Sequence, residues 1–455
     1  MLPRPAALLP RPLLVAKVGG ARPGRLSSAK ARRSTSAAAR PGTSRSVLLL
    51  PLAAARDLRQ ALPPMPLSNQ SPAEPREPAV LPSLWQTERV LLLSVSSAVL
   101  AWTVGLPALQ AGLGAAGPTL VFLWLFGVTL WSSFAVVRHA DALAVLLGEP
   151  YGTLILTMSV IGIEVVMIMA VMLTGHANPT LARDTMFSVL MIVLNGMVGL
   201  TLLLGGLRHG EQAHNLQGAN VYMGLLFTLA GVGLVLPRFT TSAPGGAHGA
   251  LLAGYVGFIS ILLYGVFLGI QTRRHRHYFQ APQRPAGDDD DEELLVGEGE
   301  HGRYALRSAG MHAVLLVAAM LPIVLLSKKL AIVLEAGLAA LAAPVALGGF
   351  LVAVLVLAPE ALGAVQAAQH NHLQRAVNIC LGSALATMAL TIPCVLLADR
   401  LLGLQIELGL EPVEIVFLTL TLLVSSVHFA SGRTNLLQGL VHLALFLGYV
   451  VTIFD

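Results

Sequence analysis

Long runs of apolar residues alternate with short polar connectors from residue 89 to the end of the chain. Each run has about 20 residues, the length at which an α-helix crosses the roughly 30 Å hydrocarbon core of a bilayer. A buried β-strand is also a continuous apolar run, but it is much shorter. The pattern therefore predicts eleven transmembrane helices, near residues 89–108, 117–137, 151–174, 185–207, 219–236, 249–270, 308–326, 341–366, 376–397, 415–430 and 436–454.

Residues 1–80 do not share this pattern. They hold thirteen Arg and Lys but only three acidic residues, with many Pro, Ala and Ser. This composition is typical of a disordered basic tail. An Arg-rich and Ser-rich start with few acids is also typical of an organellar transit peptide, and a start codon assigned too far upstream is a third interpretation.

Composition places the remaining chain in a lipid bilayer. Hydrophobic residues make up 55% and charged residues 12% of the chain, whereas soluble domains carry about 25% charged residues. Cys380 and Cys394 are fourteen positions apart in one predicted helix, hence about 21 Å apart, too far for a disulfide. The net charge of +5 lies mostly in the tail and the connectors, which indicates membrane orientation rather than binding of nucleic acid.

The basic residues of the short connectors predict the orientation. With the N-terminus in the cytoplasm, the inside connectors hold ten Arg and Lys and the outside connectors hold five, as the positive-inside rule requires. The longest connector, 271–307, is then cytoplasmic and separates residues 88–270 from residues 308–455. Its acidic run, residues 288–293, has two interpretations: a solvated connector, or a surface that attracts cations.

Two residues in the interiors of the predicted helices carry a formal charge, Glu164 and Glu360. A charge at the bilayer centre costs about 2.5–3.5 kcal/mol on insertion scales, so such a residue indicates function by default. The alternative is a neutral acid that only holds two helices together. Two glutamates in similar settings favour function, and each is followed by a short polar connector and a further apolar run.

The spacing of the two glutamates predicts an internal repeat. They lie on the third and eighth predicted helices. These two helices are five apart in chain order. Because five is odd, the two units that contain them have opposite orientations in the membrane. Eleven helices then divide as 1 + 5 + 5, an inverted repeat that places its substrate where the halves meet. Pro359, directly before Glu360, predicts a broken helix at that point.

Hydroxyl and amide side chains recur at helical spacing near these glutamates. Stripes of this kind usually serve helix packing, but beside an acidic centre they also offer oxygen ligands. The candidate supporting residues of the ion pathway are Thr153, Thr157, Ser188, Asn195, Ser383 and Thr387.

Two carboxylates with neutral oxygens suit hard cations such as Ca²⁺, and no cluster of Cys and His offers a soft metal site. A carboxyl group in a low-dielectric site is expected to hold a proton when no cation is bound, and to be ionised when a cation is bound beside it. Two protons and one divalent ion would then compete for Glu164 and Glu360. A monovalent ion would use the same pair less tightly.

Several motifs carry a family resemblance. Two groups of motifs resemble the two repeats of the bacterial calcium/sodium:proton antiporters in the cation/calcium exchanger superfamily. The first group is Leu147-Gly-Glu-Pro with Glu164-Val165, and the second is Pro359-Glu360-Ala-Leu-Gly-Ala with Gly382-Ser383. The resemblance implies that Glu164 and Glu360 are the exchange carboxylates, that access alternates between the two sides, and that the protein lies in a bacterial inner membrane.

This chain departs from the superfamily pattern at three positions. Val160 and Ile161 stand where the superfamily has Gly-Asn, and Ala386 stands where it has an amide. Fewer polar ligands are therefore expected around the cation.

The sequence thus predicts an all-α polytopic membrane protein that exports Ca²⁺, with Na⁺ or K⁺ as further substrates, in exchange for protons. The expected partners are the lipid bilayer and these cations, with no cofactor and no nucleic acid. The alternatives are a cation channel, an antiporter specific for a monovalent cation, an intramembrane enzyme and a structural scaffold. An enzyme is not expected, because no protease-like set of residues lies within the helices.

Overall fold

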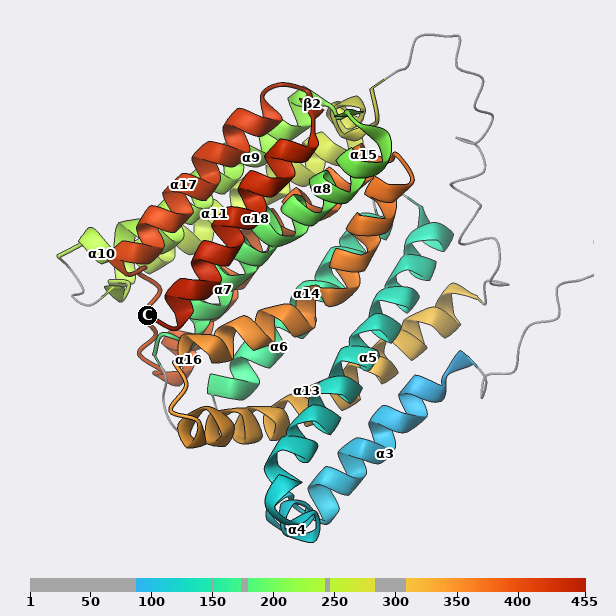
Figure 1. Cartoon of the computed structure of the whole chain (residues 1–455), viewed down its shortest axis with the longest axis vertical. Coiled ribbons are helices and arrows are strands. Elements are labelled where there is room, and N and C mark those ends of the chain that lie inside the picture. The colour runs from blue at the N-terminus through green and yellow to red at the C-terminus, as the bar shows by residue number, and fades with distance from the viewer. Residues whose placement is uncertain (1–86, 149–150, 173–178, 242–245, 283–307) are drawn as a thin grey trace, which may run out of the picture. The chain divides into compact units, whose positions relative to one another are not determined.

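The computed structural model describes residues 87–148, 151–172, 179–241, 246–282 and 308–455 (Figure 1). The predicted basic tail, 1–80, and the acidic run of the 271–307 connector lie outside these residues. The described part is helical apart from a short antiparallel pair, β1 (Gln212–Ala213) with β2 (Arg433–Thr434), and one isolated bridge. The predicted all-α class is confirmed.

The first predicted helix is a bent pair. α3 (Arg89–Thr103) and α4 (Leu106–Gly112) meet at an angle of 97°. The bend falls at Gly105, whose φ of 82° is accessible to glycine but strained for other residues, and Pro107 then occupies the first turn of α4. The expectation of one continuous helix over 89–108 was wrong, because these two residues redirect the chain.

Ten segments follow, five before and five after the long connector. A one-turn helix, η1 (Gly114–Ala116), leads into the first set. The first set comprises α5 (Gly117–Leu147), α6 (Tyr151–Met172), α7 (Leu181–Met191) with η2 (Ile192–Met197) and α8 (Val198–His209), α9 (Leu216–Ala230) with η3 (Gly231–Val235) and α10 (Leu236–Phe239), and α11 (Ala250–Gly269) with η5 (Ile270–Arg274) and η6 (Arg276–Phe279).

The second set has the same order of long helices. It comprises α13 (Ala309–Ala340), α14 (Ala346–Gln369), α15 (Leu373–Ala386) with η7 (Thr387–Thr391) and α16 (Ile392–Leu402), α17 (Pro412–Phe429) and α18 (Leu436–Ile453). Within the described residues, nine helices are long and apolar enough to cross a membrane, and the bent pair raises the number to ten. This number is close to the eleven expected.

The two sets repeat one another in detail. Each opens with a long helix, α5 or α13, and these two pack along each other with α3 against both (Figure 1). A glutamate-bearing helix follows, and then a helix that contains a π-helical turn, η2 or η7. η2 packs against α18 and η7 packs against α11, so each of these two π turns contacts the last helix of the other set. Turns of this type are frequent at functional sites.

Two helices extend well beyond their predicted ends. α5 was expected to end near residue 137 and α13 near residue 326, but they end at Leu147 and Ala340. Long basic side chains tolerate the membrane interface by reaching toward water, so Arg138 and Lys329 do not terminate these helices. The ammonium group of Lys329 lies 4.2 Å from the ring centre of Trp102 on α3.

The predicted break at Pro359 was also wrong. α14 runs without interruption from Ala346 to Gln369 with Pro359 inside it. Proline removes one backbone hydrogen bond, but membrane helices tolerate it where neighbouring helices support the freed backbone. α14 packs against α7, α8, α5 and α15, and this packing keeps it continuous.

Candidate functional site

The two membrane glutamates are both held by one face of the α15–η7 helix. Glu360 of α14 accepts a hydrogen bond from Ser383 Oγ at 2.5 Å, and Glu164 of α6 accepts one from Thr387 Oγ1 at 2.9 Å. Ser383 and Thr387 are four residues apart, so they lie one above the other on the same helix face. The carboxylates are also close enough to interact electrostatically. One glutamate from each repeat is therefore hydrogen-bonded to the same helix, at adjacent turns.

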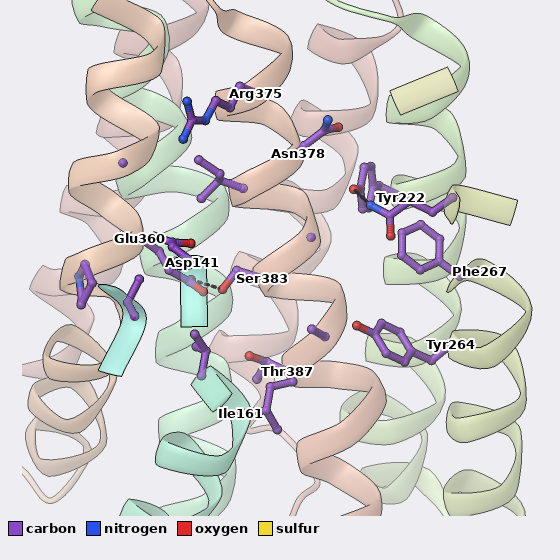
Figure 2. A pocket seen from close by; sticks show the side chains of 18 residues that line it. Asp141, Ile161, Tyr222, Tyr264, Phe267, Glu360, Arg375, Asn378, Ser383 and Thr387 are labelled. Atoms are coloured by element: carbon purple, nitrogen blue, oxygen red, sulfur yellow. Dashed lines mark hydrogen bonds between the residues drawn. The ribbon is translucent and has the colours of Figure 1, made fainter. Parts of the chain in front are cut away.

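A cavity of about 320 Å³ leads to this pair from one end of the helices (Figure 2). Side-chain exposure falls along α15 and into η7, from exposed Arg375 through half-buried Asn378 to Thr387, which is 2% exposed. The cavity is lined by Val137, Asp141, Val160, Ile161, Tyr222, Tyr264, Phe267, Gln271, Pro359, Glu360, Gly363, Arg375, Asn378, Ile379, Gly382, Ser383, Ala386 and Thr387.

The two glutamates differ in their access to this cavity. Glu360 lines it and is only partly buried, whereas Glu164 is 2% exposed and lies behind Thr387. An ion that enters from the Arg375 end therefore reaches Glu360 before Glu164.

The deepest part of the site has spare oxygen atoms. Glu164 Oε1 is buried and has no hydrogen-bond partner among the described residues, and the same holds for Thr391 Oγ1, one turn beyond Thr387. A buried polar atom without a partner costs about 1–3 kcal/mol. Carboxylate and hydroxyl oxygens in this arrangement suit a proton or a hard cation.

Ion pairs gather at the opposite end of the helices. Arg183, which is 8% exposed, lies 2.9 Å from Asp184 and 3.4 Å from Glu411. Arg238 binds the same Glu411 with both terminal nitrogens, at 3.1 and 2.8 Å. These contacts tie α7 and α10 to the start of α17.

The predicted supporting residues separate into three groups. Ser383 and Thr387 contact the glutamates. Ser188 and Asn195 instead face α17 and α18: Ser188 lies 2.6 Å from Tyr449 Oη, and Asn195 donates to Thr421 at 2.8 Å. The side chains of Thr153 and Thr157 lie outside the described part of the chain. A role for these last four in the ion pathway stays a prediction.

Asp141 and Gln271 also line the cavity, but they were not singled out from the sequence. Asp141 was placed in a connector, because the apolar run that predicts α5 stops before it. Its helical position depends on the length of α5, which no local signal revealed. By contrast, Val160, Ile161 and Ala386 do line the cavity, and they give it apolar walls where the resemblance expects Gly-Asn and an amide.

Two acidic side chains lie inside a polytopic helical bundle, each held by a hydroxyl group of the same helix, and a cavity reaches one of them. These features define the class as a membrane cation transporter. The family model described as "Sodium/calcium exchanger protein" matches residues 117–273 and 311–454. The chain belongs to this family, within the cation/calcium exchanger superfamily that its motifs indicated.

Individual relatives agree with this assignment. The chain is 45% identical over 332 residues to the "Sodium-potassium/proton antiporter ChaA" of Escherichia coli (strain K12), which covers 73% of this chain and 88% of the relative. Among solved structures, native YfkE aligns with a TM-score of 0.60 at 19% identity, over 80% of this chain and 99% of that one. The H⁺/Ca²⁺ exchanger CAX aligns with a TM-score of 0.56 at 12% identity, over 80% and 88%. The predicted inverted-repeat fold is confirmed.

Proposed function

We propose that this protein is a secondary antiporter that exchanges cations for protons, with Glu164 and Glu360 as the groups that bind both. The observation that carries the proposal is that one helix face holds a carboxylate from each repeat, because Ser383 binds Glu360 and Thr387 binds Glu164. The name of the 45% identical relative, a sodium-potassium/proton antiporter, supports the same activity.

The exchange follows from charge balance. A protonated carboxyl group is neutral and stable in a low-dielectric site, whereas an ionised one needs a cation beside it. Each cation that binds therefore displaces protons, and each proton that returns displaces the cation. With the predicted cytoplasmic N-terminus, the cavity beside Arg375 opens to the cytoplasm, where the cation would be collected. The opposite state would release it outside and admit protons.

Na⁺ or K⁺ is the favoured substrate. Ca²⁺ takes six to eight oxygen ligands, but Val160, Ile161 and Ala386 present apolar walls to the cavity. A monovalent ion needs less compensation for its lost hydration, and it matches the substrates in the relative's name. Ca²⁺ is the second candidate, because two carboxylates together balance one divalent charge.

The decisive experiment measures dissipation of a pH gradient in everted membrane vesicles on addition of K⁺, Na⁺ or Ca²⁺ in turn. We expect a response to K⁺ or Na⁺ that falls to background in both Glu164→Gln and Glu360→Gln, because an amide cannot exchange a proton for a cation. Glu211→Gln is the control, since Glu211 is 62% exposed and pairs only loosely with Arg433, at 3.6 Å.

Two results would contradict the proposal. One is the absence of any response to all three cations in vesicles that contain folded protein. The other is cation flux that persists in Glu164→Gln without movement of protons, which is the behaviour of a channel.

A further inference from the structure

A cluster of polar side chains joins α3, α5 and α13 at their predicted cytoplasmic end. His139 of α5 is 2% exposed, and its two ring nitrogens meet polar atoms from two other segments. Its Nε2 lies 3.2 Å from Oε2 of Glu88, directly before α3, and its Nδ1 lies 3.2 Å from Nδ1 of His312 on α13. Arg138 donates to the same Glu88 oxygen at 2.8 Å. The three helices run side by side (Figure 1), so the cluster connects neighbours that also pack along their length.

Only one hydrogen atom fits between the two imidazole rings. Two nitrogens 3.2 Å apart form a hydrogen bond when one of them carries the hydrogen and the other offers a lone pair. In the neutral pair, His139 donates from Nε2 to the carboxylate of Glu88, so its Nδ1 accepts from His312. One added proton is accommodated, because a charged His139 donates from both nitrogens and His312 then accepts. The positive charge of that state lies beside Glu88.

A second added proton breaks the contact between the rings. When both histidines are charged, every ring nitrogen carries a hydrogen, and two N–H groups point at each other. Two positive charges then lie side by side, and Arg138 adds a third against the single negative charge of Glu88. Like charges at this distance repel, so the doubly protonated rings separate and α5 loses this link to α13.

The cluster lies behind the wall of the cavity. Val137 and Asp141 line the cavity, and because they are four residues apart they share one face of α5. His139 lies midway between them in sequence, hence on the other side of the helix, where it meets α13. α5 also packs against α6 and α14, the helices that carry the two exchange glutamates. A change in the contact of α5 with α13 therefore moves the wall beside Glu360.

We propose that His139 and His312, together with Glu88, form a second proton-binding site of this protein, separate from Glu164 and Glu360, that senses the cytoplasmic pH. With no more than one added proton the site holds α5 against α13, and the second proton releases this contact, moves the cavity wall and slows transport. The inference rests on the proposed antiport function and adds its regulation. An antiporter that brings protons into the cytoplasm acidifies it, so a rate that falls at low cytoplasmic pH limits this acidification.

The ring pair is the group of this cluster that titrates in the physiological range, because histidine changes its charge between about pH 5 and 8. The charged and titratable groups that act on His139 are Glu88, Arg138 and His312. The other charged side chains of the described helices packed against α5 are exposed, belong to the acidic centre, or lie at least sixteen residues, about 24 Å, farther along α13 than His312: Arg89, Glu164, Glu360, Lys328, Lys329 and Glu335.

The test measures kcat for K⁺ or Na⁺ in everted vesicles, whose outer face is the cytoplasmic side, as the outer pH is lowered from 8 to 5.5. Saturating cation is used, because competition between protons and cations at the glutamates changes KM and leaves kcat intact. We expect the kcat of the wild-type protein to fall about fivefold over this range, as histidine pairs take up protons.

Two variants remove the second charge but keep the hydrogen bond. In His139→Gln and in His312→Gln, the amide donates to or accepts from the remaining histidine but takes up no proton. Each variant should keep its kcat within about twofold between pH 8 and 5.5, since one charged ring beside an amide carries no repulsion. The driving force is the same for all proteins at a given pH, so the ratio of kcat values isolates the sensor.

Glu88→Gln gives a readout that a merely structural role would not move. Loss of the negative charge disfavours uptake of both protons, so the fall of kcat should shift by about one pH unit to lower pH. His370→Gln is the matched control, because His370 is an exposed histidine directly after α14, and it should keep the wild-type profile.

Each outcome decides the inference. Flat profiles in the two glutamine variants, with wild-type rates at pH 8, support the second proton-binding site. A wild-type kcat that does not fall in acid, or a fall that is equally steep in His139→Gln and His312→Gln, overturns it and leaves the proposed antiport intact. Where a glutamine variant does not elute as folded protein, Glu88→Gln decides: a shifted fall supports the site, and an equal loss at every pH overturns it. Failure of the antiport proposal is recognised separately, by activity that survives in Glu360→Gln at pH 8.

Discussion

Three hydroxyl side chains on one helix face determine how the acidic centre is built. Ser383 and Thr387 each bind one glutamate, and Thr391 continues the row beside the unpartnered oxygen of Glu164. Because all three come from α15 and η7, a small rotation of this one helix changes the surroundings of both carboxylates together. At the scale of single residues, the acidic centre is therefore a row of hydroxyl groups on one helix, to which one glutamate from each repeat is hydrogen-bonded.

His248 makes stability depend on pH at a site away from the acidic centre. It lies in the connector between α10 and α11, and neither of its buried ring nitrogens has a hydrogen-bond partner among the described residues. Burial lowers the pKa of His248 to about 4, although nearby Asp399 acts in the opposite direction. The folded protein therefore holds His248 neutral at pH values at which the unfolded chain, with an ordinary pKa near 6.5, takes up a proton.

We expect this histidine to weaken the fold in acid. A lowered folded-state pKa means that stability is fully present above about pH 6.5 and is lost as the pH falls toward 4, by up to about 3 kcal/mol. Thermal unfolding in detergent between pH 7 and 4 should show a steeper loss for the wild-type protein than for His248→Gln. His370→Asn serves as the control, because His370 is exposed. Parallel curves for the wild-type protein and His248→Gln would refute the expectation.

At the scale of elements, close contact between the backbones of α18 and α8 supports the π turn η2. Where α18 crosses α8, a Cβ added to Gly439 would lie 2.5 Å from the backbone nitrogen of Leu203 and 2.9 Å from the carbonyl oxygen of Gly199. Small residues at such crossings let membrane helices approach. η2 lies directly before α8 and packs against the same α18, so this contact also fixes the position of the π turn.

Gly439→Ala should therefore destabilise the protein despite the better helix propensity of alanine. The added methyl group overlaps backbone atoms that cannot move aside, and overpacking of this kind costs about 1–3 kcal/mol or more. The measurement is the thermal midpoint in detergent, followed by size-exclusion chromatography. Gly257→Ala on α11 is matched, because a Cβ there meets nothing within 4 Å, and it should be neutral or stabilising. Equal midpoints for the two variants would show that the α8–α18 contact is not tight.

At the scale of the whole molecule, the cavity that reaches Glu360 enters from one end of the described helices, and a network of ion pairs connects three helices at the opposite end. The cavity beside Arg375 reaches Glu360, while Arg183, Arg238 and Glu411 connect α7, α10 and α17 at the far end. Access to Glu360 from one end is what the proposed antiport requires of one of its states, because two oppositely oriented repeats can exchange the open and closed ends.

Labelling of a single cysteine in the cavity tests both the open end and the predicted orientation. In a protein with Cys380 and Cys394 replaced by alanine, Asn378→Cys should react with a membrane-impermeant maleimide in everted vesicles and remain unlabelled in right-side-out vesicles. Val377→Cys is the neighbouring control, because Val377 is 3% exposed and does not line the cavity. Labelling of Asn378→Cys only from the external side would reverse the assigned orientation.

The sequence by itself determined the membrane class, the two acidic helices and their five-helix separation. These features depend on local properties: a span needs about 20 apolar residues wherever it lies, and a charged residue within a span stands out without any knowledge of its partners. The tertiary structure alone decided that Ser383 and Thr387, rather than Ser188 and Asn195, contact the glutamates. It also decided that α5 continues far enough to carry Asp141 into the cavity, and that Pro359 leaves α14 unbroken. The physical reason is that the direction of a helix face, the length of a helix at the interface and the effect of a proline all depend on packing against segments distant in the sequence.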